Sequence, residues 1–272
     1  DTAVGIVETV ALKHHVSSRI YEFLISEGIL ADAIDAGGEE YVFVTYERLA
    51  DYIYASYMLQ KIVNKTEPDE EIVDKINKPG VLEELNCILP EYGIELFERF
   101  PSLAKDGQMR NAFNAGILWR TDQGLIKKET KDYVEKVVVQ NTDSSEVFYD
   151  NLIKIAIYQK HPYNAKTFHR RLLKLSMAQR DAQFMELFNS WSEEGSSLNQ
   201  LMQWCLQVAG KKTLADDESI LLSSMALSWM LICTDNMLRD RVSVTLCQLL
   251  RGHIPVMLKL LQSFQMVDDV YV

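Results

Sequence analysis

The stretch that decides the fold is residues 41–59, YVFVTYERLADYIYASYML. Its first five residues alternate between β-branched and aromatic side chains, a two-residue period that predicts a short buried strand. From Tyr46 onward the apolar residues recur at intervals of three and four, which places them on one face of a helix. That face comprises Tyr46, Leu49, Ala50, Ile53 and Tyr57.

The junction between this strand and this helix is short. Thr45 is the expected helix N-cap, and Glu47 places negative charge in the first turn, where unpaired backbone N–H groups carry partial positive charge. The strand and the helix therefore abut with no loop between them. The junction fixes a change of direction between the residues before 41 and the helices expected after 61.

The residues before this stretch predict a small module. An apolar stripe predicts helix from the start of the chain to Glu27, where Gly28 ends it. The stripe includes Val4, Val7, Val10 and Ala11. One helix and two helices both fit, since Ser17 or Ser18 can cap a second one. An apolar segment at 29–34, a turn at 35–40 and a strand at 41–45 follow, so helices and a two-stranded ribbon predict a winged-helix module.

The remainder of the chain has helical periodicity, and no strand is expected after Thr45. Residues 141–145 are the best internal linker, with Ser144 or Ser145 capping a helix that ends at His161 and Pro162. Further helices are expected at 165–175, 179–190, 197–209, 217–234, 238–250 and 256–265. The predicted fold class is mainly α: an N-terminal winged-helix-like module followed by an α-solenoid of HEAT/TPR-like helical pairs. The expected domains are the module at 1–63, a helical connector at 64–143 and a helical-repeat segment at 144–272.

The composition bounds the class of protein. Of 272 residues, 47% are hydrophobic, which is enough for a packed core. A net charge of -11 argues against nucleic-acid binding, because that binding draws its affinity from clustered Lys and Arg. Four widely spaced cysteines favour a reducing compartment, and the longest apolar stretch, 220–233, falls short of the roughly 20 residues that span a membrane. A cytoplasmic protein is expected, and Asp1 in place of an initiating Met suggests an excised fragment or processed product.

Motifs for catalysis and for metal or nucleotide binding are weak. The sequence Gly-Lys-Lys-Thr at 210–213 lacks the earlier glycine and the preceding strand of a phosphate-binding loop. The five histidines have no metal-ligand spacing; His14 and His15 are adjacent and would point about 100° apart on a helix. Pro68-Asp69 with Glu135-Lys136 lies in helical or linker segments rather than on the strands that a metal-dependent nuclease needs. We therefore expect no catalytic residue, metal ligand or cofactor site in this chain.

Two arginine–aspartate pairs, Arg180-Asp181 and Arg239-Asp240, fall where helices are expected to start. Aspartate in a first turn is stabilised by local N–H groups, and the preceding arginine can reach a carboxylate or carbonyl of a neighbouring repeat. These pairs are therefore interpreted as packing residues.

Several short motifs occur in an order that resembles a known family. The string VFVTYERLADYIYASYML, with Tyr46, Glu47, Arg48 and Asp51, resembles the Tyr-Glu-Arg-Phe-type signature that follows the NTPase in antiviral STAND NTPases of bacteria, the Avs group. The motifs downstream are Gly80-Val81-Leu82-Glu83 with Leu89-Pro90-Glu91, Leu118-Trp119-Arg120, His161-Pro162-Tyr163-Asn164-Ala165, Gln179-Arg180-Asp181, Leu238-Arg239-Asp240-Arg241 and Asp268-Asp269-Val270-Tyr271-Val272. The chain departs from the family at Leu49 and Ala50, where Phe and Ser are more frequent, and it contains no Walker or nuclease motif.

The resemblance implies a regulatory and sensor fragment: the winged-helix end of the STAND core and the first repeats of a C-terminal sensor. In the family, the sensor recognises a phage protein such as terminase or portal, and binding permits oligomerisation and activates an N-terminal effector. ATP and Mg²⁺ are then expected in the full-length parent, and an upstream NTPase domain of the same chain is an expected partner.

Two alternatives stay open. One is a helical-repeat interaction scaffold unrelated to defence. The other is a winged-helix transcription regulator, whose reading helix at 18–27 would present Arg19 together with Glu22 and Glu27. The expected turn carries Asp35, Glu39 and Glu40. Phosphates would be repelled by these acidic residues, which disfavours the regulator.

Overall fold

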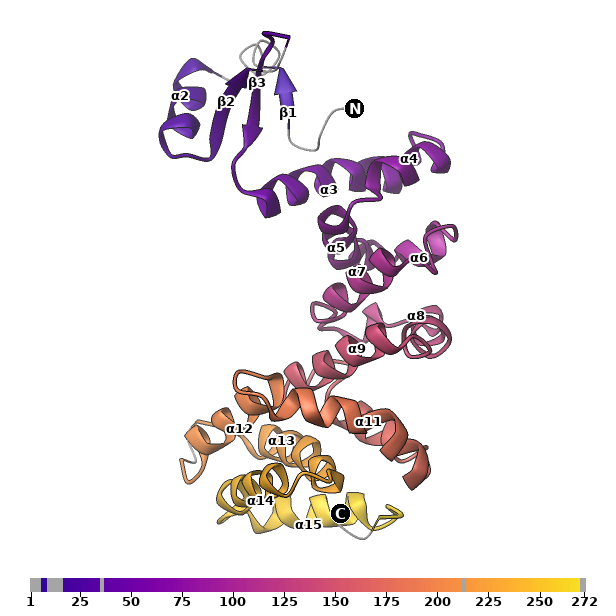
Figure 1. Ribbon diagram of the computed structural model, residues 1–272, viewed down its shortest axis with the longest axis vertical. Helices are drawn as coiled ribbons and strands as arrows, with labels where there is room; N and C mark the ends of the chain where they lie inside the picture. Colours follow the sequence, from indigo (N-terminus) through magenta and orange to yellow (C-terminus); the bar gives the residue numbers. More distant parts are fainter. Residues whose placement is uncertain (1–5, 9–16, 35–36, 212–213, 270–272) are drawn as a thin grey trace. The chain divides into compact units, whose positions relative to one another are not determined.

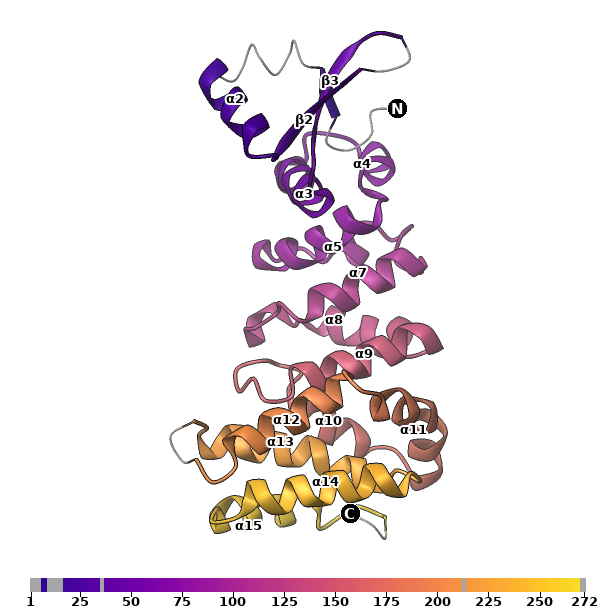
Figure 2. The same ribbon diagram turned by 60° about the vertical axis from the view of Figure 1, so that its left-hand side comes forward.

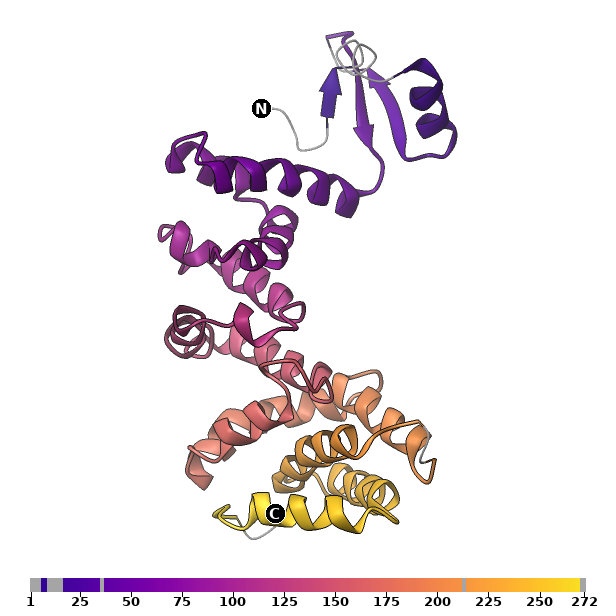
Figure 3. The same cartoon turned by 180° about the vertical axis from the view of Figure 1, so that it is seen from behind.

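The computed structural model describes residues 6–8, 17–34, 37–211 and 214–269. The fold is mainly α, as expected, with a single sheet among the described residues (Figures 1 and 3). Two compact units divide the chain, Asp1–Ile117 and Leu118–Val272. The three-part division expected from the sequence remains a prediction.

The sheet belongs to the first unit and has three antiparallel strands, β1 (Ile6–Glu8), β2 (Leu30–Ile34) and β3 (Glu40–Val44). Their order is β1-β3-β2, so β3 is the central strand. The helix α2 (Ser18–Ser26) precedes β2 and packs against it with Tyr21 buried (Figure 1). Among the residues of this module whose side chains the structure describes, Tyr21 and Val42 are the buried apolar ones.

The strand β1 lies where a helix was expected near the start of the chain, so that prediction is wrong at residues 6–8. The sheet also has three strands, whereas a two-stranded ribbon was expected. Val7, part of the expected helical stripe, pairs with Val42 across the sheet, and Ile6 pairs with Phe43. Pairing of the backbone with β3 satisfies the N–H and C=O groups of β1, and this tertiary contact overrides the local periodicity. His14, His15 and Asp35 lie outside the described residues.

The helix α3 (Glu47–Asn64) follows β3 directly, but Thr45 is not its N-cap. Tyr46 occupies that position, and the Thr45 hydroxyl donates to the carbonyl oxygens of Gly28 and, at 3.2 Å, Ile29. The Thr45 side chain therefore ties the end of β3 to the turn before β2 rather than closing the start of α3.

The buried face of α3 also differs from the prediction. Leu49, Ile53 and Tyr57 are 36%, 51% and 55% exposed. The buried residues are Ala50, Ala55, Met58 and Ile62. The face with the small alanines packs on α5 (Pro79–Ile88), because short side chains let two helices approach closely. Of the expected face, only Ala50 is buried.

The rest of the first unit is helical. It comprises α4 (Asp69–Ile76), α5, η1 (Leu89–Tyr92), α6 (Leu96–Arg99) and α7 (Gly107–Ile117). The helix α5 packs against both α3 and α7, so these three helices form a continuous stack (Figure 2). At the α5–α7 crossing, a Cβ on Gly116 would lie 2.7 Å from the backbone oxygen of Asn86, so only glycine fits without displacement.

The second unit is a helical array. Its elements are η2 (Gln123–Leu125), α8 (Lys128–Tyr133), the π-helical turn η3 (Val134–Val138), α9 (Thr142–Lys154), α10 (Ala165–Leu172), α11 (Met177–Ser192), α12 (Ser197–Val208), α13 (Asp217–Trp229), η4 (Met230–Ile232), α14 (Asn236–Leu250) and α15 (Ile254–Phe264). The six helices expected between 165 and 265 are confirmed, with ends shifted by a few residues. No strand follows Val44 in the described part of the chain, as predicted.

The helices of this unit stack in two rows. One row is α9, α12 and α14, in which each helix contacts the next; the other is α10, α13 and α15. Each pair of consecutive helices, α9–α10, α12–α13 and α14–α15, therefore contributes one helix to each row. The helix α13 is surrounded, and its residues 220–229 are all buried.

The segment expected as a linker, 141–145, is instead the start of α9. The Asn141 side chain accepts a hydrogen bond from the Ser144 backbone N–H at 3.1 Å, so Asn141, and not Ser144 or Ser145, is the N-cap. The helix ends at Lys154, and His161 and Pro162 lie in the following turns. Asparagine is as good an N-cap as serine, and α9 therefore begins about one turn before the predicted start.

Candidate binding pocket

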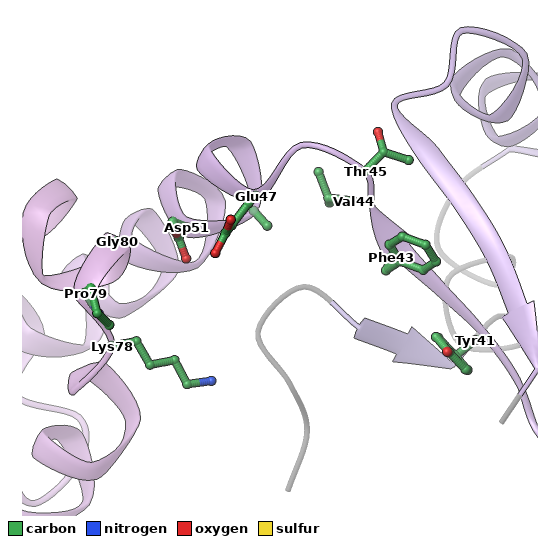
Figure 4. Close-up of a pocket in the computed structure, with 10 residues that line it drawn as sticks. Tyr41, Phe43, Val44, Thr45, Glu47, Asp51, Lys78, Pro79 and Gly80 are labelled. Carbon is green, nitrogen blue, oxygen red and sulfur yellow. The ribbon is translucent and has the colours of Figure 1, made fainter. Parts of the chain in front are cut away.

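A hollow lies within the first unit, where β3 leads into α3 and meets the start of α5 (Figure 4). Its volume is about 680 Å³. The lining residues are Tyr41, Phe43, Val44, Thr45, Glu47, Ala50, Asp51, Lys78, Pro79 and Gly80. The strand supplies an aromatic and apolar wall, and the two helix starts supply the charged groups.

Two carboxylates enter the pocket from α3. Glu47 and Asp51 are four residues apart, so they lie one above the other on the same helical face. Figure 4 shows both side chains extending from α3 on the side where Lys78 lies. Lys78 is the only cation among the lining residues, and its Nζ lies 6.0 Å from the centroid of the Tyr54 ring. The lining therefore carries an excess of negative charge.

Asp51 is held against the first turn of α5. A Cβ on Gly80 would come within 1.8 Å of Asp51 Oδ2, so the absent side chain at position 80 makes room for the carboxylate. Pro79 is favoured at the first helical position, and the start of a helix attracts negative charge. Burial and the nearby Glu47 carboxylate nevertheless raise the pKa of Asp51, with Arg48 and Lys78 acting in the opposite direction.

An ion-pair cluster flanks the pocket. Arg48 Nη1 lies 2.5 Å from Glu83 Oε2 and 4.0 Å from Glu84 Oε1. The Arg48 side chain is 70% exposed, so the pair contributes little to stability. Burial raises the pKa of Glu84. Arg48 is therefore paired with glutamates of α5, and it also offsets part of the negative charge of Asp51.

The residues of the motif at 46–51 thus lie on two surfaces. Glu47 and Asp51 line the pocket, Arg48 pairs beside it, and Tyr46 is 58% exposed. The sequence reasoning missed the aromatic pair Tyr41 and Phe43 as pocket residues, and it missed Lys78 and Gly80. The spacing of Glu47 and Asp51 already placed both on one helical face, but their juxtaposition with residues 78–80 depends on tertiary packing.

In the motif Leu118-Trp119-Arg120, the aromatic side chain is exposed and the cation is buried. Trp119 is 69% exposed, and Arg120 is buried with Nη1 donating to the Leu125 carbonyl oxygen at 3.5 Å. Arg120 therefore holds the turn that leads into η2.

The motif at 161–165 is a structural turn. Buried His161 accepts a hydrogen bond from the Tyr163 backbone N–H at Nδ1, at 3.1 Å. The Pro162 carbonyl oxygen accepts from the Thr167 hydroxyl at 2.6 Å. Asn164 is the N-cap of α10, where its Oδ1 accepts from the Lys166 backbone N–H at 3.1 Å. These residues shape the start of α10 and present no reactive group.

Arg180 is a buried packing residue. Its Nη1 donates to the Leu175 carbonyl oxygen at 2.7 Å and its Nη2 to the Asp268 carbonyl oxygen at 2.6 Å. The guanidinium carbon lies 5.5 Å from the centroid of the Trp229 ring. Asp181, by contrast, is exposed. Arg180 therefore joins α11 to the segment that follows α15.

The pair Arg239–Asp240 does not reproduce this arrangement. Arg239 is half-buried and donates to the side-chain oxygen of Asn236, one turn earlier in the same helix, while Asp240 is exposed. Both arginine–aspartate pairs lie in the second turn, because α11 begins at Met177 and α14 at Asn236. The expectation that both pairs begin helices and pack between repeats is wrong for Asp181 and Asp240.

Among the described residues, no group of three or more His, Cys, Asp or Glu side chains is placed to hold a metal ion. Burial raises the pKa of Cys205 to about 12, so this thiol is protonated and unreactive at neutral pH. No helix within the described ranges is both long and apolar enough to cross a membrane.

Comparison with models of protein families, with curated proteins and with solved structures gave no match. The candidate pocket is therefore identified from its geometry and charge alone.

Proposed function

We propose that this chain is the regulatory and sensor part of a bacterial anti-phage STAND NTPase. In this proposal a phage protein, such as terminase or portal, binds the helical array, and binding is relayed to an NTPase domain and an effector in the full-length parent. ATP and Mg²⁺ bind in that parent, and oligomerisation accompanies activation. The order of the short motifs, which resembles the Avs group, is the link to this family.

The first unit supports the winged-helix part of the proposal. A strand order of β1-β3-β2, with a helix between β1 and β2, is the arrangement of a winged-helix module. The strands β2 and β3 form the hairpin that would be the wing. In a STAND protein this module connects the NTPase core to the sensor, and α3 leads directly from the sheet into the helical stack.

The second unit gives the strongest support for the proposal, because its helices stack in two rows. Contacts of α12 with both α9 and α14, and of α13 with both α10 and α15, are what successive helical repeats produce. Such arrays bury their cores between neighbouring pairs and leave long surfaces for a folded partner. The array is the observation that favours protein recognition over catalysis.

One array surface has the chemistry of a protein interface. Ile254, Leu258 and Leu261 lie on one side of α15 and are 63%, 53% and 60% exposed. Their spacing of four and three residues makes them a continuous apolar stripe. We name Ile254, Leu258 and Leu261 the α15 stripe and assign it to the sensing surface.

The charges of α2 disfavour the transcription-regulator alternative. Arg19 and Glu22 in α2 and Glu27 at its C-cap are all exposed, so the helix together with its cap presents more negative than positive charge. A repeat scaffold without coupling to an NTPase has the same fold, and only an activity measurement separates it from the proposal.

The test uses the full-length parent, challenged with phage in cells and assayed for ATP hydrolysis with purified phage terminase or portal. Deleting residues 64–272 should abolish phage-triggered activity. Leu258→Glu with Leu261→Glu should reduce stimulation while leaving basal hydrolysis intact. Gln262→Glu, which adds a single negative charge at an exposed polar position of α15, is the control for each of the two leucine substitutions made singly. Triggered activity that survives the deletion overturns the proposal.

A further inference from the structure

The helix α3 has two uncharged faces, of which one is buried and the other is exposed. The buried face packs mainly on α5 (Figure 1). The opposite face, which we name the outer face of α3, exposes at least 36% of each of its large apolar side chains. These are Tyr46, Leu49, Tyr52, Ile53, Tyr57 and Val63.

The outer face of α3 lacks the charges that a solvated helix face normally carries. The polar residues between its apolar ones are the uncharged Ser56, Gln60 and Asn64. Together these side chains cover about 140° of the helix circumference. Single exposed apolar residues are common, but a contiguous apolar face that is rich in tyrosine is typical of a protein interface. We propose that the outer face of α3 is the docking surface for a basic amphipathic helix of a partner protein.

The shape of the outer face selects a helix. From Tyr46 to Val63 it extends for about 26 Å along a single helix. The side of a helix is a convex ridge, which cannot enclose a small molecule as a pocket does. A second helix with apolar residues at intervals of three and four can pack along such a ridge over its whole length.

The charge around the outer face selects a basic partner. The first unit contains 21 Asp and Glu residues but 10 Lys and Arg residues. Acidic residues lie beyond both ends of the face: Glu47 in the first turn of α3, and Glu70, Glu71 and Asp74 on α4, which packs against α3. All four are exposed. A second copy of this unit, a nucleic acid or an anionic membrane would therefore be repelled.

The cations nearest to the outer face are already paired within the unit. Arg48 lies 2.5 Å from a Glu83 carboxylate oxygen, and Lys61 and Lys75 both pair with Glu67. These ion pairs leave the exposed acidic residues at the two ends of the face to attract cations from a partner.

Tyrosines of α3 already bind ammonium groups of this chain. Lys61 Nζ lies 4.5 Å from the centroid of the Tyr57 ring, and Lys78 Nζ lies 6.0 Å from that of Tyr54. Tyr46 and Tyr52 are 58% and 50% exposed, so lysines that flank the apolar stripe of a partner helix can stack on their rings. This partner is separate from the one assigned to the α15 stripe.

The test is binding of the peptide rhodamine-KLLKLLKKLLKLLK-amide to the whole chain, followed by fluorescence anisotropy. As a helix, this peptide has all its leucines on one face and its lysines on the other. A saturable rise in anisotropy is expected, and high salt should weaken it. The same peptide with glutamate in place of every lysine should give no rise. A scrambled peptide of the same composition should bind about tenfold more weakly, because it has no apolar face.

Variants assign the surface. Ile53→Ser with Tyr57→Ser should weaken binding by about tenfold, because it removes apolar area from the outer face of α3. Ile254→Ser with Leu258→Ser is the matched control, since it changes two exposed apolar residues of α15 and should leave binding unchanged. Circular dichroism establishes that both variants are folded.

Equal binding of the lysine and glutamate peptides by the unaltered chain would overturn the proposal, whatever the folding of the variants. The same affinity in both double variants would also overturn it. A dimer in sedimentation velocity that Ile53→Ser with Tyr57→Ser dissociates would assign the outer face of α3 to a second copy instead.

Discussion

The helices α3 and α13 are both rich in apolar residues, yet they are buried to very different extents. Along its 18 residues α3 buries four, whereas α13 buries residues 220–229 without interruption. The number of neighbours explains the difference, since α13 packs on α10, α12, α14 and α15, and α3 packs mainly on α5. An apolar sequence therefore marks a core in one helix and an available surface in the other.

The largest expected effect comes from removing the centre of the α13 packing. Trp229 is fully buried, its Nε1 donates to His169 Nδ1 at 3.0 Å, and its ring contacts Phe264 and Arg180. Trp229→Ala should lower the free energy of unfolding of the second unit by about 3–5 kcal/mol.

Urea unfolding followed by tryptophan fluorescence measures this, because all four tryptophans lie in the second unit. Trp119→Ala is the matched control: its ring is 69% exposed, and the change should cost less than about 0.5 kcal/mol. Similar losses for both variants would contradict the contrast between buried and exposed apolar residues.

The next effect concerns the first unit. Gly116→Ala places a methyl group 2.7 Å from the Asn86 backbone oxygen and should force α5 and α7 apart, at a cost of about 1–3 kcal/mol. Gly107→Ala, in the same helix, meets only the tip of Arg110 at 3.7 Å and should be neutral or slightly stabilising. Thermal unfolding by circular dichroism compares the two. If both alanines behave alike, the close approach does not limit the packing of this unit.

The stability of the row α10, α13 and α15 should depend on pH through His169. His169 Nδ1 accepts from Trp229, and Nε2 lies 3.1 Å from the Ser263 carbonyl oxygen, so the ring is neutral with its proton on Nε2. Burial lowers the pKa of His169. The unfolded chain then binds the proton more readily, so stability is complete above about pH 6.5 and falls as the pH drops below it.

Urea midpoints between pH 7.5 and 5.5 measure this slope. His169→Gln should reduce the slope, because it removes the group whose pKa is lowered by burial. An unchanged slope in His169→Gln would mean that another group titrates in this range.

The smallest effect is expected on the outer face of α3. Ile53→Ser changes a side chain that is 51% exposed and should shift the free energy of unfolding by less than about 0.5 kcal/mol. Ile62→Ser, on the opposite, buried face of the same helix, is 1% exposed and should cost several-fold more. Denaturant unfolding by circular dichroism measures both. A large cost for Ile53→Ser would show that this face is covered.

The helices of the second unit could be predicted because their signals are local. Ser176 and Gln179 form a capping box at α11, and the Asp216 side chain accepts from the Ser219 N–H at 2.7 Å at α13. These caps and the apolar period lie within a few residues of each other, so such helices can be predicted from sequence, although α11 was expected to begin at Gln179 and its capping box was not identified.

The features that the sequence did not predict depend on contacts between residues that are far apart in the sequence. The strand β1 exists because Val7 pairs with Val42, and periodicity alone could not reveal that partner. On α3 the large residues were expected to be buried, but the close packing with α5 selected Ala50 and Ala55. In the pocket, Glu47 and Asp51 could be paired by spacing, whereas Lys78 and Gly80 join them only through the α3–α5 packing.

The Arg180 side chain has a consequence for the order of folding. It links the Leu175 carbonyl to the Asp268 carbonyl, 88 residues beyond Arg180, and closing so long a loop carries a large entropic cost. The helical pairs between them make contacts with their neighbours and can assemble early, so the bond from Arg180 to Asp268 forms only after those pairs are in place. Removing the Arg180 guanidinium should therefore accelerate unfolding while leaving the refolding rate of the second unit nearly unchanged.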